Sequence, residues 1–247
     1  DGADWIKLNV TGGAINPGRT SFGVQWQQDE LDAVVGTAAD YGMKVAAHAH
    51  TVQGITRSVK AGVHSIEHGT FMDDRTAELM KKRGTAYVPT MTAMKWIGND
   101  AGASDAMPAE VLAKAEGAGA RIDATVRMAY EKGVWVVFGT DAGVFPHGLN
   151  AMEFEYMTAA GIPPLVAIQS ATIEAARLLD LASDLGSISP GKLADIVAVR
   201  GDPVADISQL RDVPFVKKAG VIYKNTADCA MCRNCPITGP PLTPAAR

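Results

Sequence analysis

The sequence predicts an α/β fold, namely the C-terminal five β/α units of a (β/α)8 barrel followed by a small β module. Short apolar runs alternate with amphipathic stretches, which is typical of right-handed βαβ units around a parallel sheet. Polar residues stand where several apolar runs end, as they do on the catalytic face of barrels. A closed barrel has eight strands and the sequence offers five, so we expect a partial barrel.

The expected barrel elements occupy residues 1–184. Apolar runs predict strands at 3–10, 44–48, 63–68, 85–90 and 134–140. Helical periodicity predicts helices at 29–42, 51–62, 73–84, most of 108–133, near 150–160 and at 164–181. Glycines at 42, 62 and 84 are expected to end the first three helices. A first strand at a bare edge would leave an unpaired ladder, so a preceding segment or a cleaved partner chain is expected to complete the barrel.

The pattern changes after residue 184. Residues 185–226 predict short strands with glycine-centred turns, including a hairpin whose turn is Ala219-Gly220.

Residues 227–247 form a tail rich in cysteine and proline. The spacing of its cysteines is similar to that of zinc or iron–sulfur ligands. A fourth cysteine and a nearby histidine are absent, which favours one disulfide with a free thiol, or three free thiols, at Cys229, Cys232 and Cys235.

Composition excludes some classes of function. The formal net charge is −4 and no dense run of lysine and arginine occurs, so nucleic acid is not an expected partner. No apolar run reaches the ~18 residues of a membrane span. The opening residues lack the basic and apolar regions of a signal peptide, and they enter a strand at once, so we expect the native N-terminus upstream. The cellular compartment stays undecided.

Four residues of metal-ligating type stand on successive expected strands. Lys7 lies inside the first run, His48 and His68 close the second and third, and Asp141 closes the last. Alternation along a strand puts Lys7 on the barrel's inner face, where burial would lower its pKa. A neutral amine could capture carbon dioxide, and the carbamate would bridge two metals. The alternative is a buried lysine paired with a carboxylate.

The remaining histidines differ in their expected roles. His48 and His68 stand at the ends of two expected strands, and their imidazoles suit zinc, manganese, cobalt or nickel. His50 shares a face with His48 and is a candidate for substrate binding, whereas His64 begins its strand and is expected to be structural. His147, in the loop after Asp141, would contact substrate or support the loop.

Asp141 has two interpretations. It could bind metal and accept a proton from water, as in metal-assisted hydrolysis. It could instead cap the following helix.

These stretches together resemble the metal-dependent amidohydrolase superfamily. The nearest branch is the imidazolonepropionase-like and Xaa-Pro dipeptidase group, which includes ochratoxin-hydrolysing amidohydrolases. The resemblance covers nearly all of residues 1–224 and rests on GADWIKLNVTGG, VAAHAHTVQGITRSVKAGVHSIEHGT, FGTDAGVFPHG, ATIEAARLLDL and GSISPGKLADIVAVRGDP.

The resemblance implies a distorted (β/α)8 barrel beside a small β-sandwich built from both chain ends. It makes Lys7 a carboxylated bridging ligand, His48 and His68 ligands, and Asp141 the acid of the last strand. Two divalent metal ions, expected to be zinc, would hold a bridging hydroxide that attacks the scissile carbonyl. Asp141 would accept its proton and pass it to the leaving nitrogen. Homo-oligomers are common in this family.

The chain departs from the family at its start, because the His-x-His pair of the first barrel strand and the N-terminal part of the β-sandwich are missing. The expected activity, cleavage of an amide in a dipeptide or N-acyl amino acid, is therefore assigned to the intact protein. Opening of a cyclic amide and an inactive barrel fragment serving as an assembly module are the alternatives. A cationic site for a substrate carboxylate would favour peptide-like substrates, and its candidate suppliers are Arg57, Arg83, Arg121 and Arg127.

Overall fold

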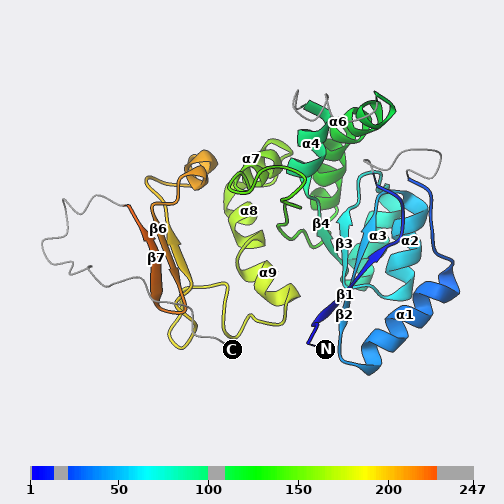
Figure 1. Cartoon of the computed structure of the whole chain (residues 1–247), viewed down its shortest axis with the longest axis horizontal. Helices are drawn as coiled ribbons and strands as arrows, with labels where there is room; N and C mark the ends of the chain where they lie inside the picture. Colours follow the sequence, from blue (N-terminus) through cyan, green and yellow to red (C-terminus); the bar gives the residue numbers. More distant parts are fainter. Residues whose placement is uncertain (1, 14–21, 100–108, 227–247) are drawn as a thin grey trace, which may run out of the picture.

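A parallel four-stranded sheet organises the first part of the chain (Figure 1). The computed structural model describes residues 2–13, 22–99 and 109–226. The strands are β1 (Trp5–Asn9), β2 (Lys44–Ala49), β3 (Ser65–His68) and β4 (Ala86–Val88). They lie in the order β1-β2-β3-β4, each parallel to the next. Neighbouring strands are thus consecutive in sequence, as a barrel requires, and the predicted α/β class is confirmed.

Three crossover helices cover one face of this sheet (Figure 1). They are α1 (Gln28–Asp40), α2 (Val52–Ala61) and α3 (Asp74–Arg83). Side chains of Thr51 and Asp73 cap the N-termini of α2 and α3. Both helices end at a glycine in the left-handed conformation, so the predicted ends at Gly62 and Gly84 are confirmed.

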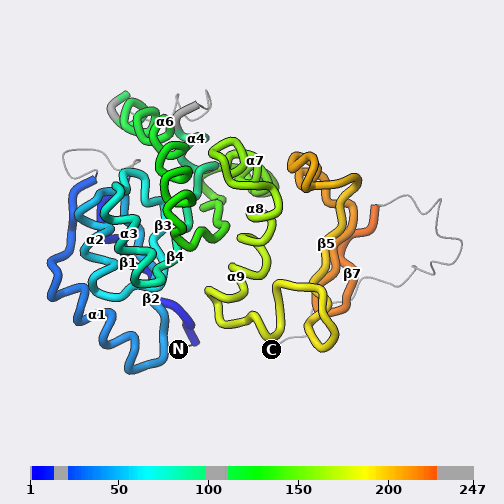
Figure 2. The backbone as a smooth tube through the Cα atoms, turned by 180° about the vertical axis from the view of Figure 1, so that it is seen from behind, coloured from blue at the N-terminus to red at the C-terminus, as the bar shows by residue number. Residues whose placement is uncertain are grey.

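The helices of the second part pack on one another in sequence order (Figure 2). They are α4 (Met91–Asn99), α6 (Ala109–Glu131), α7 (Met152–Ala159), α8 (Pro164–Ser170) and α9 (Ile173–Leu178). The prediction of one helix over 164–181 is wrong. The main chain of Thr172, with φ −121° and ψ −91°, leaves the helical region and separates α8 from α9.

The expected fifth strand at 134–140 lies in its predicted place but is not a regular strand. Tyr87 and Val136 form an isolated parallel bridge beside β4. The N–H of Phe138 then donates to the carbonyl of Ser170 on α8, at 3.2 Å. Because the main chain turns to α8 at this point, the ladder with β4 stops after one bridge.

A three-stranded antiparallel sheet follows the helices and lies beyond α8 and α9, away from the parallel sheet (Figure 1). Its strands are β5 (Ile196–Ala198), β6 (Phe215–Lys218) and β7 (Val221–Asn225), and the 3₁₀ helix η1 (Ile207–Arg211) lies between β5 and β6. Ala219 and Gly220, both with positive φ, form the turn of the predicted hairpin. The three cysteines lie outside the described residues. No described helix has the length and hydropathy that crossing a membrane demands.

The inner and outer faces of the sheet follow the predicted alternation. Leu8 on β1 and Val10, directly after this strand, are buried in the core cluster, together with Val45 and Ile66 on the next strands. Side chains that alternate with them point to the other face. The carboxyl ends of β2 and β3, where His48 and His68 stand, therefore meet at one edge.

Candidate metal centre

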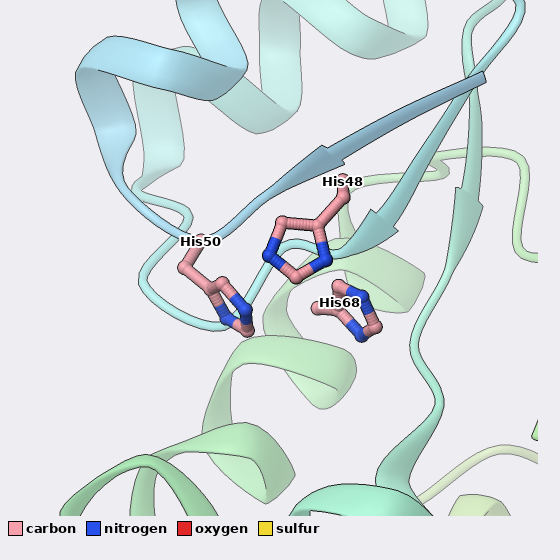
Figure 3. Close-up of side chains that lie close together, drawn as sticks. All are labelled: His48, His50 and His68. Carbon is pink, nitrogen blue, oxygen red and sulfur yellow. The ribbon is translucent and has the colours of Figure 1, made fainter. Parts of the chain in front are cut away.

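Three histidines converge at the carboxyl ends of β2 and β3 (Figure 3). His48 is on β2, His50 directly follows it, and His68 ends β3. Their nearest metal-ligating nitrogens all lie within 4.8 Å of one another. The ring of His68 stacks on that of His50 with centroids 4.8 Å apart, and His48 stands edge-on to both. The parallel register sets His48 opposite Glu67 and His68 opposite Ala49, so the histidines stand where both strands end, and the positive φ of His68 marks its departure from regular strand geometry.

Burial keeps the three imidazoles neutral. His50 and His68 are almost fully buried, and His48 is half-buried. Loss of hydration lowers the pKa of His50 to about 3 and that of His68 well below its ordinary value. Burial also lowers the pKa of His48, with a further contribution from the Lys7 charge. A neutral imidazole has a free ring-nitrogen lone pair, which is the form that binds a metal.

The hydrogen bonds of His68 fix which of its nitrogens is free. Its Nδ1 lies 2.7 Å from Oγ1 of Thr90, and that hydroxyl donates to the carbonyl of Pro89 at 2.7 Å. Since the hydroxyl proton is used by Pro89, Nδ1 is the donor to Thr90. The proton therefore resides on Nδ1, and Nε2 carries the lone pair. Metal-binding histidines in proteins are commonly oriented by a hydrogen bond of this kind.

His50 provides the test of whether a metal fits. Its Nδ1 contacts Oγ1 of Thr70 at 2.9 Å, and its main-chain N–H donates to Oγ1 of Thr11. Its Nε2 is buried and has no hydrogen-bond partner among the residues that the structure describes. An unpaired buried nitrogen is costly, and beside two further imidazoles it is well explained as a metal ligand. The three histidines could thus hold a divalent ion of the kind that imidazole prefers.

Lys7 lies on the predicted inner face, but the prediction that it is buried is wrong. Its side chain is 49% exposed, and its Nζ forms an ion pair of 2.5 Å with Glu67. Glu67 also accepts a hydrogen bond from Ser65. β1 pairs only with β2 among the described residues, so the side of Lys7 away from β2 is open to water. The pairing with a carboxylate matches the alternative interpretation of this lysine, without its burial.

Asp141 acts on the centre from an exposed position, and His147 follows it in the same loop. Asp141 is exposed, and its charge acts on His48, whose pKa it raises in opposition to burial. It has a positive φ of 56° and does not belong to the close histidine group. His147 is also exposed. His64 lies at the other end of β3, where its Nδ1 accepts a hydrogen bond from the Val45 N–H, in line with a structural role.

The family model described as "Amidohydrolase family" matches residues 2–226. The chain belongs to the amidohydrolase family. It is 30% identical over 228 residues to ochratoxinase of Aspergillus niger, covering 90% of this chain and 47% of that protein. The chain spans about half the length of the curated relatives it matches.

Solved amidohydrolase structures superpose on most of the chain. A Xaa-Pro dipeptidase crystallised with methionine in its active site shares 50% identity and a TM-score of 0.87, covering 91% of this chain and 55% of the other. The A. niger ochratoxinase structure shares 29% identity and a TM-score of 0.78, covering 90% and 51%. The resemblance stated from the sequence motifs is therefore confirmed, and a partial barrel agrees with these neighbours.

Two of the four candidate arginines have structural partners. Arg57 donates to the carbonyl of Trp26 at 2.6 Å, and Arg127 donates to that of Ala160 at 3.0 Å. Arg83 and Arg121 are exposed. Arg83 and Arg121 therefore stay candidates for a substrate carboxylate, whereas Arg57 and Arg127 already bind main-chain carbonyls.

Sequence analysis missed a buried acid that binds the start of α4, the helix that follows Thr90 in the chain. Glu153 on α7 is fully buried, and its carboxylate accepts hydrogen bonds from the N–H groups of Met91 and Thr92, the first two residues of α4. Burial raises its pKa to about 7, although these hydrogen bonds oppose the shift. The signal was an acid in an apolar stripe, since Met157 and Ala160, four and seven residues later, are also buried.

Proposed function

We propose that the intact protein is a metal-dependent hydrolase that cleaves the amide bond of a dipeptide or an N-acyl amino acid, including ochratoxin-type amides. The observation that carries this proposal is the neutral histidine group with the unpaired buried Nε2 of His50. The likeness to a Xaa-Pro dipeptidase and to ochratoxinase supports amides with a free amino-acid carboxylate as substrates.

His48, His50 and His68 would hold the metal, for which zinc is the first candidate. A divalent ion at such a site supplies Lewis-acid chemistry, which polarises a carbonyl and makes water more acidic. The chain's own contribution is to present unprotonated nitrogens. Thr90 does this for His68 by accepting a hydrogen bond from Nδ1–H, which leaves Nε2 unprotonated, and burial does it for His50.

Asp141 is the proposed proton acceptor. It is exposed, so a substrate and water can reach it, and it is close enough to His48 to influence that ring's charge. A carboxylate so placed can take a proton from water and deliver it to the leaving nitrogen. His147, in the same loop, is the proposed contact to substrate. His50 is proposed as a metal ligand and not as a substrate contact.

Lys7 is the proposed bridging ligand in carboxylated form. Half of its side chain is open to water, so carbon dioxide can reach Nζ. Carboxylation would turn a cation into an anion beside Glu67, and the present ion pair would then become a repulsion. Modification of Lys7 therefore requires the Nζ–Glu67 contact to open.

A further segment of the protein is the proposed partner of this half of the barrel. β1 has a free edge among the described residues, and a groove of about 700 Å³ with an apolar lining that includes Ile168, Leu179 and Val197 lies between α8–α9 and the three-stranded sheet. The relatives are about twice as long as this chain. A further segment of the protein is proposed to cover both surfaces and to supply the remaining ligands.

The proposal is tested by assaying the intact protein with Zn²⁺, Co²⁺ or Mn²⁺ against Xaa-Pro dipeptides, N-acyl amino acids and a cyclic imidazolone. Hydrolysis of the first two classes, lost with a chelator and restored by metal, is the expected result. His64→Asn is the matched control for His68→Asn, because the two histidines lie at opposite ends of β3. Turnover of the cyclic amide alone, or activity that survives complete metal removal, would contradict the proposal.

A further inference from the structure

Strand β4 and the residues after it contribute no predicted metal ligand, yet they contact His68 at two points. Tyr87, the middle residue of β4, is fully buried, and its hydroxyl donates a hydrogen bond of 2.9 Å to the main-chain carbonyl of His68. Thr90 accepts from Nδ1 of the same histidine. The main chain and the ring of His68 are thus held separately, both from the β4 side.

The main chain of His68 is in a conformation that needs support. Its φ is +70°, in the left-handed region that residues other than glycine rarely adopt. The last paired residues of β3 and β4 are Glu67 and Val88, so the His68 carbonyl lies beyond that ladder. Strained residues of this kind persist where their surroundings over-determine them, and they cluster at functional sites.

The ring of Tyr87 also packs against the next residue. Gly69 has a φ of +55°, and a β-carbon there would lie 2.5 Å from Cε2 of Tyr87. The ring therefore lies directly on the His68–Gly69 turn. The main chain of Tyr87 is fixed in turn, because its N–H donates to Trp135 and its carbonyl accepts from Val137. The fixed main chain of Tyr87 therefore holds its ring in place against the His68–Gly69 turn.

We propose that Tyr87 is a positioning residue of the metal centre, whose hydroxyl holds the strained His68 main chain so that the imidazole faces His48 and His50. The inference rests on the proposed metal site. A buried tyrosine hydroxyl needs an acceptor in any case, and a purely structural role would change stability alone. A positioning role also changes the affinity for metal and the coordination of the bound ion.

The test is a Co²⁺ titration of the intact protein, of Tyr87→Phe and of the control Tyr130→Phe. Tyr130 packs at the margin of the same core on α6. Tyr87→Phe is expected to weaken Co²⁺ binding by about 10- to 100-fold, the usual cost of losing a group that orients a ligand. The visible absorption of bound Co²⁺ should change as well, while Tyr130→Phe leaves both quantities unchanged.

A second variant replaces Tyr87 by 4-aminophenylalanine, which keeps a weaker donor at the same position. Its Co²⁺ dissociation constant should fall between those of the unaltered protein and Tyr87→Phe. Should Tyr87→Phe not fold, Tyr87→4-fluorophenylalanine, which keeps the size of the ring substituent without a donor, takes its place, and a dissociation constant equal to that of the unaltered protein then overturns the inference.

The outcomes separate the inference from the proposed function. Equal affinity and equal spectra for Tyr87→Phe and the unaltered protein would overturn the positioning role and leave the metal site intact. Failure of the unaltered protein to bind Co²⁺ would overturn the metal site and the positioning role together.

Discussion

The two sides of the candidate metal centre differ in how far the fold fixes them. On the histidine side, His50 and His68 are buried and each ring is hydrogen-bonded to a threonine hydroxyl. On the open side, Lys7 is half exposed and paired with Glu67, and Asp141 is exposed. The comparison teaches that burial and hydrogen bonds within the described chain orient the histidine side, whereas the open side depends on a metal, a substrate or further chain for its final arrangement.

The largest effect is expected from breaking the histidine side. His68→Ala should weaken Zn²⁺ binding by more than about 100-fold, because loss of an orienting partner alone costs about 10- to 100-fold. His64→Ala, at the other end of β3, should retain the affinity of the unaltered protein. Calorimetric titration of both variants measures the difference, and equal losses would show that the site lies elsewhere.

The free energy of unfolding is expected to depend on pH through Glu153, the buried acid that binds the start of α4. The folded-state pKa of Glu153 is raised to about 7 from an ordinary value of 4.5. Between these values the native state binds the proton that the unfolded state releases, so this group's contribution to the free energy of unfolding falls as pH rises. The variant Glu153→Gln has no carboxyl group to titrate at this position. Its free energy of unfolding, relative to that of the unaltered protein, should therefore rise by up to about 3 kcal/mol between pH 4.5 and 7.

Denaturant unfolding of both proteins at a series of pH values measures this change. The opposite slope contributed by the histidines, whose pKa values are lowered, occurs in both proteins and cancels in the difference. A stability difference that does not vary between pH 4.5 and 7 would contradict the assignment of Glu153 as a buried, titrating carboxyl.

The smallest effect is expected on the open side. Lys7→Met should change the free energy of unfolding of the metal-free protein by less than about 1 kcal/mol, because exposed ion pairs contribute little. Lys95→Met is the matched variant, since Lys95 pairs with Asp123 while only 17% exposed and should cost more. Urea denaturation compares the two. A larger loss from Lys7→Met would mean that the open side is as tightly held as the histidine side.

Local rules were sufficient to predict much of this architecture. The alternation of side chains along 3–10 placed Lys7 opposite Leu8 and Val10, as observed. The parallel arrangement of 44–48 and 63–68 brought His48 and His68 to one edge. Gly62 and Gly84 marked where α2 and α3 stop, whereas α1 ends at Asp40 with Tyr41 as its C-cap, just before the expected Gly42. Each of these inferences depends on residues that are close in sequence or on the sheet's regular geometry.

The remaining features depend on contacts between distant residues. The sequence predicts a substrate contact for His50, whereas the structure places it in the histidine group. Its position past the end of β2 is held by a hydrogen bond to Thr11, 39 residues earlier. The apolar stripe of α7 marks Glu153 as buried, but its hydrogen bonds to the start of α4 reach about sixty residues back along the chain, and periodicity within α7 does not describe them. The exposure of Lys7 depends on what lies beside β1, which strand alternation does not describe.

The most direct test of the metal centre is an anomalous difference map from crystals of the protein grown with Zn²⁺. The account predicts a zinc peak within bonding distance of ring nitrogens of His48, His50 and His68, including Nε2 of His68. Zinc bound only at the cysteines of the tail, or no peak beside the three histidines, would contradict it.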